Sequence, residues 1–137
     1  MRAFLCLFFY TPYNMHSVSS NAVAVALSYT SDEHFTGRYW VNGKKIYTKT
    51  IQISITRGNH SFNHNIADID YITDFRAISK SNNSGEFRTI PFVYYGALDS
   101  WSVGIYVTKT AYQIECGTAF ASAHSVGYLT LEYTKTV

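Results

Sequence analysis

The sequence predicts an all-β protein: a β-sandwich or jelly-roll-like domain of about seven to eight strands that follows a short N-terminal helix. Aromatic residues make up 17% of the chain and charged residues only 15%, a balance that suits pleated sheet better than solvated helix. Short apolar–polar alternations separated by turn residues recur along most of the chain. The length of 137 residues fits one domain of this kind and is too short for two.

The N-terminal part, residues 1–30, is predicted to be separate from a β domain over 31–137. The apolar run from Ala3 to Phe9 is too short to cross a membrane and no clear signal-peptidase site follows it, so we expect a strand or an apolar plug against a neighbour, with a secretion signal as the alternative. Between Met15 and Tyr29 apolar residues recur three and four positions apart. This spacing predicts a short oligomerising helix, with a helix packed on its own domain as the alternative.

The strands of the β domain are predicted from runs of alternating residues. We expect strands over 39–41, 44–50, 51–56, 66–78, 86–95, 101–107, 111–116 and 126–134. We expect turns or loops over 58–65, 81–85, 108–110 and 117–125. Ile51, Ile53 and Ile55 alternate with polar residues, and so do Leu129 and Leu131, which predicts one buried face for each of these strands.

Three local signals refine this layout. Asn42-Gly43 is typical of a tight hairpin turn in which both residues have positive φ. The strand over 66–78 is expected to break near Asp70 to Asp74. Pro91 lacks a backbone N–H and therefore favours a position at the edge of a sheet.

Composition excludes several classes of function. The net charge of +2 gives no basic patch for nucleic acid, so we predict no nucleic-acid partner. The two cysteines, Cys6 and Cys116, are expected to be buried thiols, because two cysteines make neither a disulfide framework nor a complete zinc site. The nucleotide-binding, serine-hydrolase and zinc-protease motifs do not occur. We therefore predict a protein without catalytic residues, cofactor or membrane insertion.

Two polar clusters are weak candidates for chemistry. His60 and His64 are four residues apart and are weak candidates for metal ligands, although two solvated loop histidines are the simpler interpretation. Asp68, Asp70 and Asp74 form the densest acidic cluster, and paired carboxylates perform glycoside hydrolysis. Solvated or turn-forming aspartates are expected here, with a calcium or glycan contact and a hydrolase pair as alternatives.

The aromatic residues give the better indication of a binding site. Aromatic rings pack against the apolar faces of sugars, and tyrosine adds a hydroxyl group at low entropic cost. The candidates lie around the turn over 96–100 and in the stretch over 117–125, which we expect to be a loop of small residues. The candidate glycan-binding residues are Tyr94, Tyr95, Trp101, Phe120 and His124. The alternative is that Trp101 belongs to the core and the tyrosines are ordinary surface residues of strands.

Both ends of the chain resemble one protein family. The stretch N-M-H-S-V-S-S-N-A-V-A, residues 14–24, resembles a motif of tail-fibre-like proteins of bacteriophages and prophages. Residues 29–51, with W-V-N-G-K and Y-T-K-T, are similar to the segment that follows that motif in the family, and L-T-L-E-Y-T-K-T, residues 129–136, is similar to its C-terminal end. Lys45 stands where the family usually has proline, and Asn42 where it has aspartate.

The resemblance implies the C-terminal, distal domain of a trimeric, β-rich tail fibre. It implies a virion protein, made in the host cytoplasm, that contacts other tail or baseplate proteins. We therefore expect a homotrimeric, non-enzymatic receptor-binding module that attaches the virion to a host cell-surface carbohydrate. The alternatives are a fragment of a tail-associated glycan depolymerase and a secreted bacterial adhesin.

Overall fold

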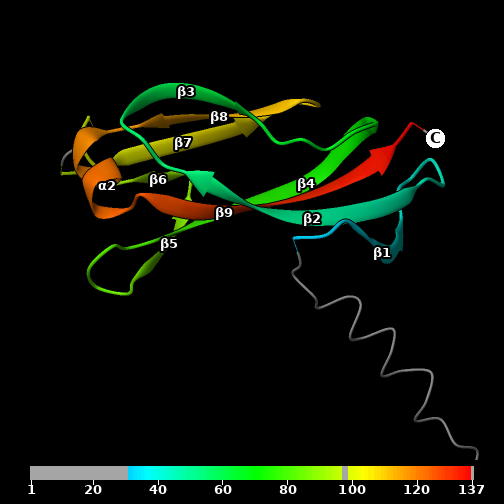
Figure 1. Ribbon diagram of the computed structural model, residues 1–137, viewed down its shortest axis with the longest axis horizontal. Helices are drawn as coiled ribbons and strands as arrows, with labels where there is room; N and C mark the ends of the chain where they lie inside the picture. Colours follow the sequence, from blue (N-terminus) through cyan, green and yellow to red (C-terminus); the bar gives the residue numbers. More distant parts are fainter. Residues whose placement is uncertain (1–30, 97–98, 137) are drawn as a thin grey trace, which may run out of the picture.

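The computed structural model describes residues 31–96 and 99–136, which form two antiparallel β-sheets and one short helix, α2 (Thr118–Ala123) (Figure 1). The all-β prediction is confirmed. The described part of the chain contains nine strands, slightly more than expected. The predicted helix over 15–29, the apolar run over 3–9 and Cys6 lie outside the described residues.

The larger sheet has five strands in the order β1-β2-β9-β4-β5. Its strands are β1 (His34–Tyr39), β2 (Lys45–Ser54), β9 (Val126–Lys135), β4 (Ile69–Lys80) and β5 (Phe87–Ile90). The central strand β9 pairs along most of its length with β2 on one side and with β4 on the other. Its alternating sequence places Leu129 and Leu131 on the inner face and Thr130 and Glu132 on the outer face, as predicted.

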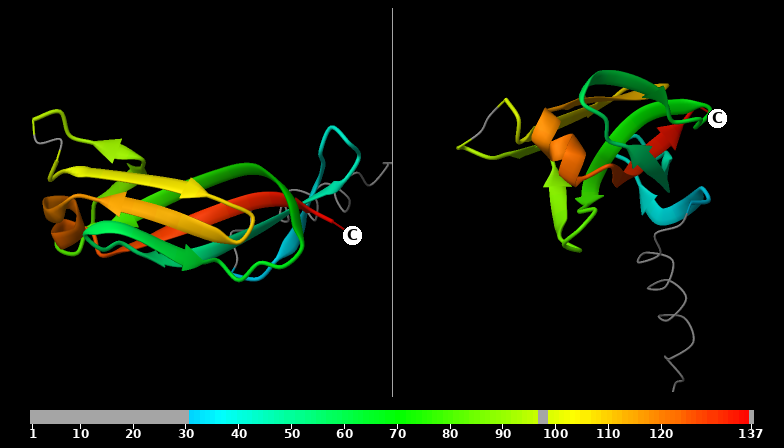
Figure 2. Two further views of the ribbon diagram at one scale, coloured as in Figure 1. Left: turned by 90° about the horizontal axis from the view of Figure 1, so that it is seen from above. Right: turned by 60° about the vertical axis from the view of Figure 1, so that its left-hand side comes forward.

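The smaller sheet has four strands in the order β3-β8-β7-β6. Its strands are β3 (Gly58–Asn63), β8 (Ala111–Cys116), β7 (Ser102–Val107) and β6 (Phe92–Val93). Figure 1 shows this sheet stacked on the larger one, which gives a β-sandwich-like architecture. Figure 2 shows α2 at one end of the sandwich and the β1–β2 hairpin near the C-terminus at the other end.

The core lies between the two sheets. Ile53, Leu129 and Leu131 enter it from the larger sheet, and Ile114 enters it from the smaller one. Phe120 of α2 closes one end of the core and is completely buried. Burial of such side chains contributes roughly 1.5–3 kcal/mol each, which makes this cluster the main source of stability.

The β1–β2 hairpin is confirmed, but its turn is longer than predicted. Gly43 has φ +78°, whereas Asn42 does not take positive φ. The Gly43 N–H donates to the Trp40 carbonyl, and the Trp40 N–H donates to the Lys44 carbonyl, both at 2.8 Å. The turn therefore has three residues, with glycine in the left-handed position, because the Asn42 side chain instead accepts a hydrogen bond from the Lys44 N–H at 3.1 Å.

Two segments predicted as loops have regular structure. Residues 58–63 form strand β3, and its six cross-strand pairs with β8 impose this conformation on a largely exposed, polar sequence. Residues 118–123 form α2, so the predicted loop over 117–125 is wrong. Its three alanines favour helix, and the packing of Phe120 into the core fixes the helix on the sandwich.

The chain passes from one sheet to the other at Pro91. Strand β5 ends at Ile90 on the edge of the larger sheet, and β6 begins at Phe92 on the edge of the smaller sheet. The predicted edge position of this proline is therefore confirmed. The predicted break near Asp70 to Asp74 is wrong, because β4 is continuous from Ile69 to Lys80; its pairing with β9 only shifts register between Ile69 and Tyr71 and again between Ile72 and Asp74.

Candidate ligand-binding surface

The turn between β6 and β7, described over residues 94–96 and 99–101, presents two of the predicted aromatic residues to solvent. Tyr95 is 94% exposed and Tyr94 is 57% exposed. The Tyr94 N–H donates to the Trp101 carbonyl at 2.9 Å and closes the base of this turn. Gly96 lies against the Tyr94 ring, where a Cβ would come within 3.0 Å of Cε1. The turn thus holds Tyr94 through its backbone, and its ring leaves little room for a side chain at position 96.

The same turn is fastened to α2 by main-chain contacts. The Phe120 N–H donates to the Ser100 carbonyl at 3.0 Å, and the Gly117 N–H donates to the Ser102 carbonyl at 2.9 Å. A Cβ on Gly117 would lie 2.6 Å from the Ser100 oxygen and 2.7 Å from the Asp99 oxygen. The close approach of turn and helix therefore requires glycine at position 117.

A cluster of aromatic side chains lies between the turn and the core of the sandwich. The ring of Phe120 packs against Phe92 with centroids 5.7 Å apart, and against the half-buried Trp101 at 6.3 Å in an edge-on arrangement. His124 stacks on the other side of Phe120 at 4.6 Å. The Arg88 guanidinium lies 4.6 Å from the centroid of the Phe92 ring. The cluster links the exposed turn to the core of the sandwich.

Two of the five candidate glycan-binding residues belong to this internal cluster. Phe120 and His124 were expected on an exposed loop, but both are buried. That expectation is wrong because 118–123 is helical, and the helix turns both side chains inward. Tyr94 and Tyr95 remain available to a ligand, whereas Trp101, Phe120 and His124 hold the turn in place.

The buried His124 is best accommodated as a neutral imidazole. Desolvation lowers its pKa, and the nearby positive charge of Arg88 lowers it further, while Glu86 acts in the opposite direction. Within the described residues its Nδ1 atom has no hydrogen-bond partner. Glu86 and a hydrogen bond to the Lys80 backbone favour the protonated ring, but desolvation and Arg88 outweigh them, so protonation of His124 costs free energy in the folded state.

The three aspartates do not form a catalytic pair on one strand face. Asp68 precedes β4 and has φ +60°. Asp70 accepts a hydrogen bond from the Lys44 ammonium at 2.6 Å, and this bond lowers the pKa of its carboxyl group. Asp74 lies 3.7 Å from the Arg76 guanidinium. A general acid needs a raised pKa, so the environment of Asp70 is the opposite of that required.

The two candidate metal ligands have separate structural roles. His60, on β3, is exposed, and its Nε2 lies 2.8 Å from the Arg57 carbonyl. His64 is buried, and its Nε2 donates to the Thr108 carbonyl at 3.1 Å while its Nδ1 accepts from the Ile66 N–H at 3.2 Å. Both ring nitrogens of His64 are thus used within the protein, and neither is free for a metal.

Other sources of reactivity are also accounted for within residues 31–96 and 99–136. No group of three or more His, Cys, Asp or Glu side chains there is arranged to hold a metal ion. Burial raises the pKa of the Cys116 thiol to about 11, so the predicted buried thiol is confirmed at this position and is unreactive. No helix in the described part is long and apolar enough to span a membrane.

Sequence reasoning missed two ion-pair groups that hold the first strand in place. Glu33 accepts a hydrogen bond from the buried Tyr133 hydroxyl and forms an ion pair with Lys135. Desolvation opposes ionisation of Glu33, but these two bonds outweigh it and lower the pKa of its carboxyl group. Arg38 pairs with the buried Glu132 at 2.5 Å. The partners are far apart in the sequence, and no local pattern signals them.

No protein-family model, curated protein or solved structure matches this chain. The likeness to tail-fibre-like proteins therefore depends on the sequence motifs over 14–51 and 129–136.

Proposed function

We propose that this protein is the distal module of a phage tail fibre, a homotrimer that attaches the virion to a host cell-surface glycan without cleaving it. The observation that supports glycan binding is the pair of exposed tyrosines, Tyr94 and Tyr95, on a turn that is fastened to the sandwich. Binding residues commonly lie on loops that a rigid scaffold positions. The tail-fibre assignment rests on the resemblance of both ends of the chain to that family.

The chemistry of the turn suits a sugar. Each tyrosine offers an aromatic face to the C–H groups of a pyranose ring and a hydroxyl group to its polar edge. The exposed Asp99 in the same turn adds a carboxylate that accepts hydrogen bonds from sugar hydroxyls.

The expected affinity of one site is low and that of the trimer is higher. A stacked ring contributes on the order of 1 kcal/mol, so a single turn binds weakly. Three turns on one trimer raise the apparent affinity for a repeating polysaccharide by about 10²–10⁴. Contacts of Asp70 with Lys44 and of Asp74 with Arg76 support a non-enzymatic role, because they engage two of the three aspartates of the densest acidic cluster.

The test compares two tyrosines of equal exposure. A panel of purified bacterial surface polysaccharides is screened with the full chain, and the tightest binder is titrated against Tyr94→Ala, Tyr95→Ala and the control Tyr106→Ala. Tyr106 is 57% exposed, as Tyr94 is, but lies on β7. We expect about a fivefold loss of affinity per site for the first two variants and no loss for the control.

Two results would contradict the proposal. Equal losses in all three variants would show that the turn has no special role in binding. Release of reducing ends from the polysaccharide, abolished by Asp70→Asn, would instead establish the depolymerase alternative.

A further inference from the structure

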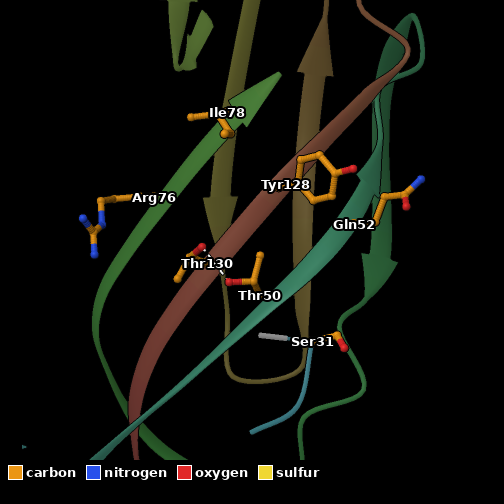
Figure 3. Close-up of a pocket in the computed structure, with 7 residues that line it drawn as sticks. All are labelled: Ser31, Thr50, Gln52, Arg76, Ile78, Tyr128 and Thr130. Carbon is orange, nitrogen blue, oxygen red and sulfur yellow. Dashed lines mark hydrogen bonds between the residues drawn. The ribbon is translucent and has the colours of Figure 1, made fainter. Parts of the chain in front are cut away.

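The outer face of the five-stranded sheet contains a hollow of about 640 Å³ (Figure 3). Its floor is formed by side chains that point away from the core on β2, β9 and β4, among them Thr50, Thr130, Tyr128 and Ile78. Tyr128 and Ile78 are cross-strand partners, and each keeps about two fifths of its side chain exposed. No element of the described residues covers this hollow.

Three polar side chains that line the hollow already have hydrogen-bond or ion-pair partners within the protein. The Thr50 and Thr130 hydroxyl groups bond to each other at 2.9 Å. Among the described residues that line the hollow, Arg76 alone is charged, and it lies within 4 Å of the carboxylates of Asp74 and Glu132. The free-energy cost of covering this surface is therefore lowest when the covering segment is uncharged and largely apolar.

An uncharged segment of this chain ends at the rim of the hollow. Ser31, the first described residue, is one of the residues that line it. From Ala3 to Ser31 the sequence contains no Asp, Glu, Lys or Arg. Glu33, two residues later, is held by Tyr133 and Lys135, so the point at which this segment joins the sheet is fixed.

The sequence of that segment offers apolar residues beyond those of its predicted oligomerising seam. The seam uses Met15, Val18, Ala22, Val25 and Tyr29. Val23 and Leu27 are four residues apart and fall on the side of the helix opposite to this seam. A helix rises about 1.5 Å per residue, which places Leu27 about 6 Å and Val23 about 12 Å before Ser31.

Along such a helix Val23 and Leu27 would be about 6 Å apart, which is close to the spacing of the outward-facing residues on β9. Thr130 and Tyr128 are two residues apart on β9, which corresponds to about 7 Å along the strand. We propose that residues 22–30 of the same chain lie over this hollow, with Val23 and Leu27 packed against Tyr128 and Ile78. In this arrangement one side of the helix packs against the sheet and the opposite side packs against partner helices.

Thiol accessibility tests this placement in the full chain. In a Cys6→Ser background, Tyr128→Cys and the exposed control Tyr106→Cys are alkylated under native conditions. We expect the thiol at 128 to react at least tenfold more slowly than the thiol at 106, and Leu27→Asp to remove most of this difference. Equal rates at 128 and 106 without Leu27→Asp would overturn the proposal.

Oxidative cross-linking provides a second measurement. The pair Leu27→Cys with Tyr128→Cys is expected to form a disulfide within one chain, whereas Leu27→Cys with Tyr106→Cys is expected to form none. A disulfide between two chains, or equal yields for the two pairs, would overturn the assignment to the same chain. Neither measurement depends on glycan binding, so this proposal and the proposed function fail independently.

Discussion

Replacement of Phe120 by alanine distinguishes a residue that supports the binding turn from one that contacts the ligand. The Phe120 side chain is completely buried and contacts the rings of Phe92, Trp101 and His124. Loss of a buried phenylalanine side chain costs about 3–5 kcal/mol, since the lost transfer energy is added to the cost of the cavity. For a domain of this size, that corresponds to a fall in melting temperature of roughly 10–20 °C.

The assay is thermal unfolding followed by circular dichroism, with Tyr95→Ala as the matched control. Both variants remove an aromatic side chain, but Tyr95 is almost fully exposed, so its removal is expected to change stability by no more than about 0.5 kcal/mol. Phe120→Leu, which keeps most of the volume, is expected to cost about 1–2 kcal/mol. A melting temperature for Phe120→Ala within two or three degrees of the parent would refute the assignment of Phe120 to the core.

Two further predictions concern the same end of the molecule. Gly117→Ala is expected to destabilise the fold by about 1–3 kcal/mol in denaturant titrations, because its Cβ would lie 2.6 Å from the Ser100 oxygen, whereas Ala119→Gly should cost only about 1 kcal/mol. Since burial lowers the pKa of His124 in the folded state, the free energy of unfolding should be highest above pH 6.5, the ordinary histidine pKa, and fall as the pH drops below it. His124→Gln should flatten this decline, and an unchanged pH profile would contradict the buried neutral imidazole.

The strands that sequence reasoning predicted correctly alternate apolar and polar residues. Ile53 and Ile55 are buried between exposed polar neighbours, and Leu129 and Leu131 are completely buried. In these segments the period of two is visible in the sequence itself. Strand β3 has no such pattern, because five of its six side chains are exposed and its conformation comes from pairing with β8. A contact between distant segments leaves no local signal.

The candidate site, like the set of strands, was predictable from the sequence only in part. The exposure of Tyr94 and Tyr95 next to a turn follows from the sequence, and both are exposed in the structure. The burial of Phe120 and His124 does not follow, because a run of small residues fits a loop as well as a short helix. The requirement for glycine at position 117 comes from its close approach to Ser100, and this approach exists only in the folded chain.

The attachment of the 94–101 turn has a consequence for how its specificity can vary. Two main-chain hydrogen bonds hold this turn: one joins Tyr94 and Trp101 across its base, and the other joins Phe120 of α2 to Ser100. Such bonds are indifferent to the side chain that each residue bears. Positions such as Tyr95 and Asp99 can therefore be exchanged for other residues while the sandwich stays folded. A library randomised at those positions, with Gly96 and Gly117 retained, is a practical route to domains that select different surface sugars.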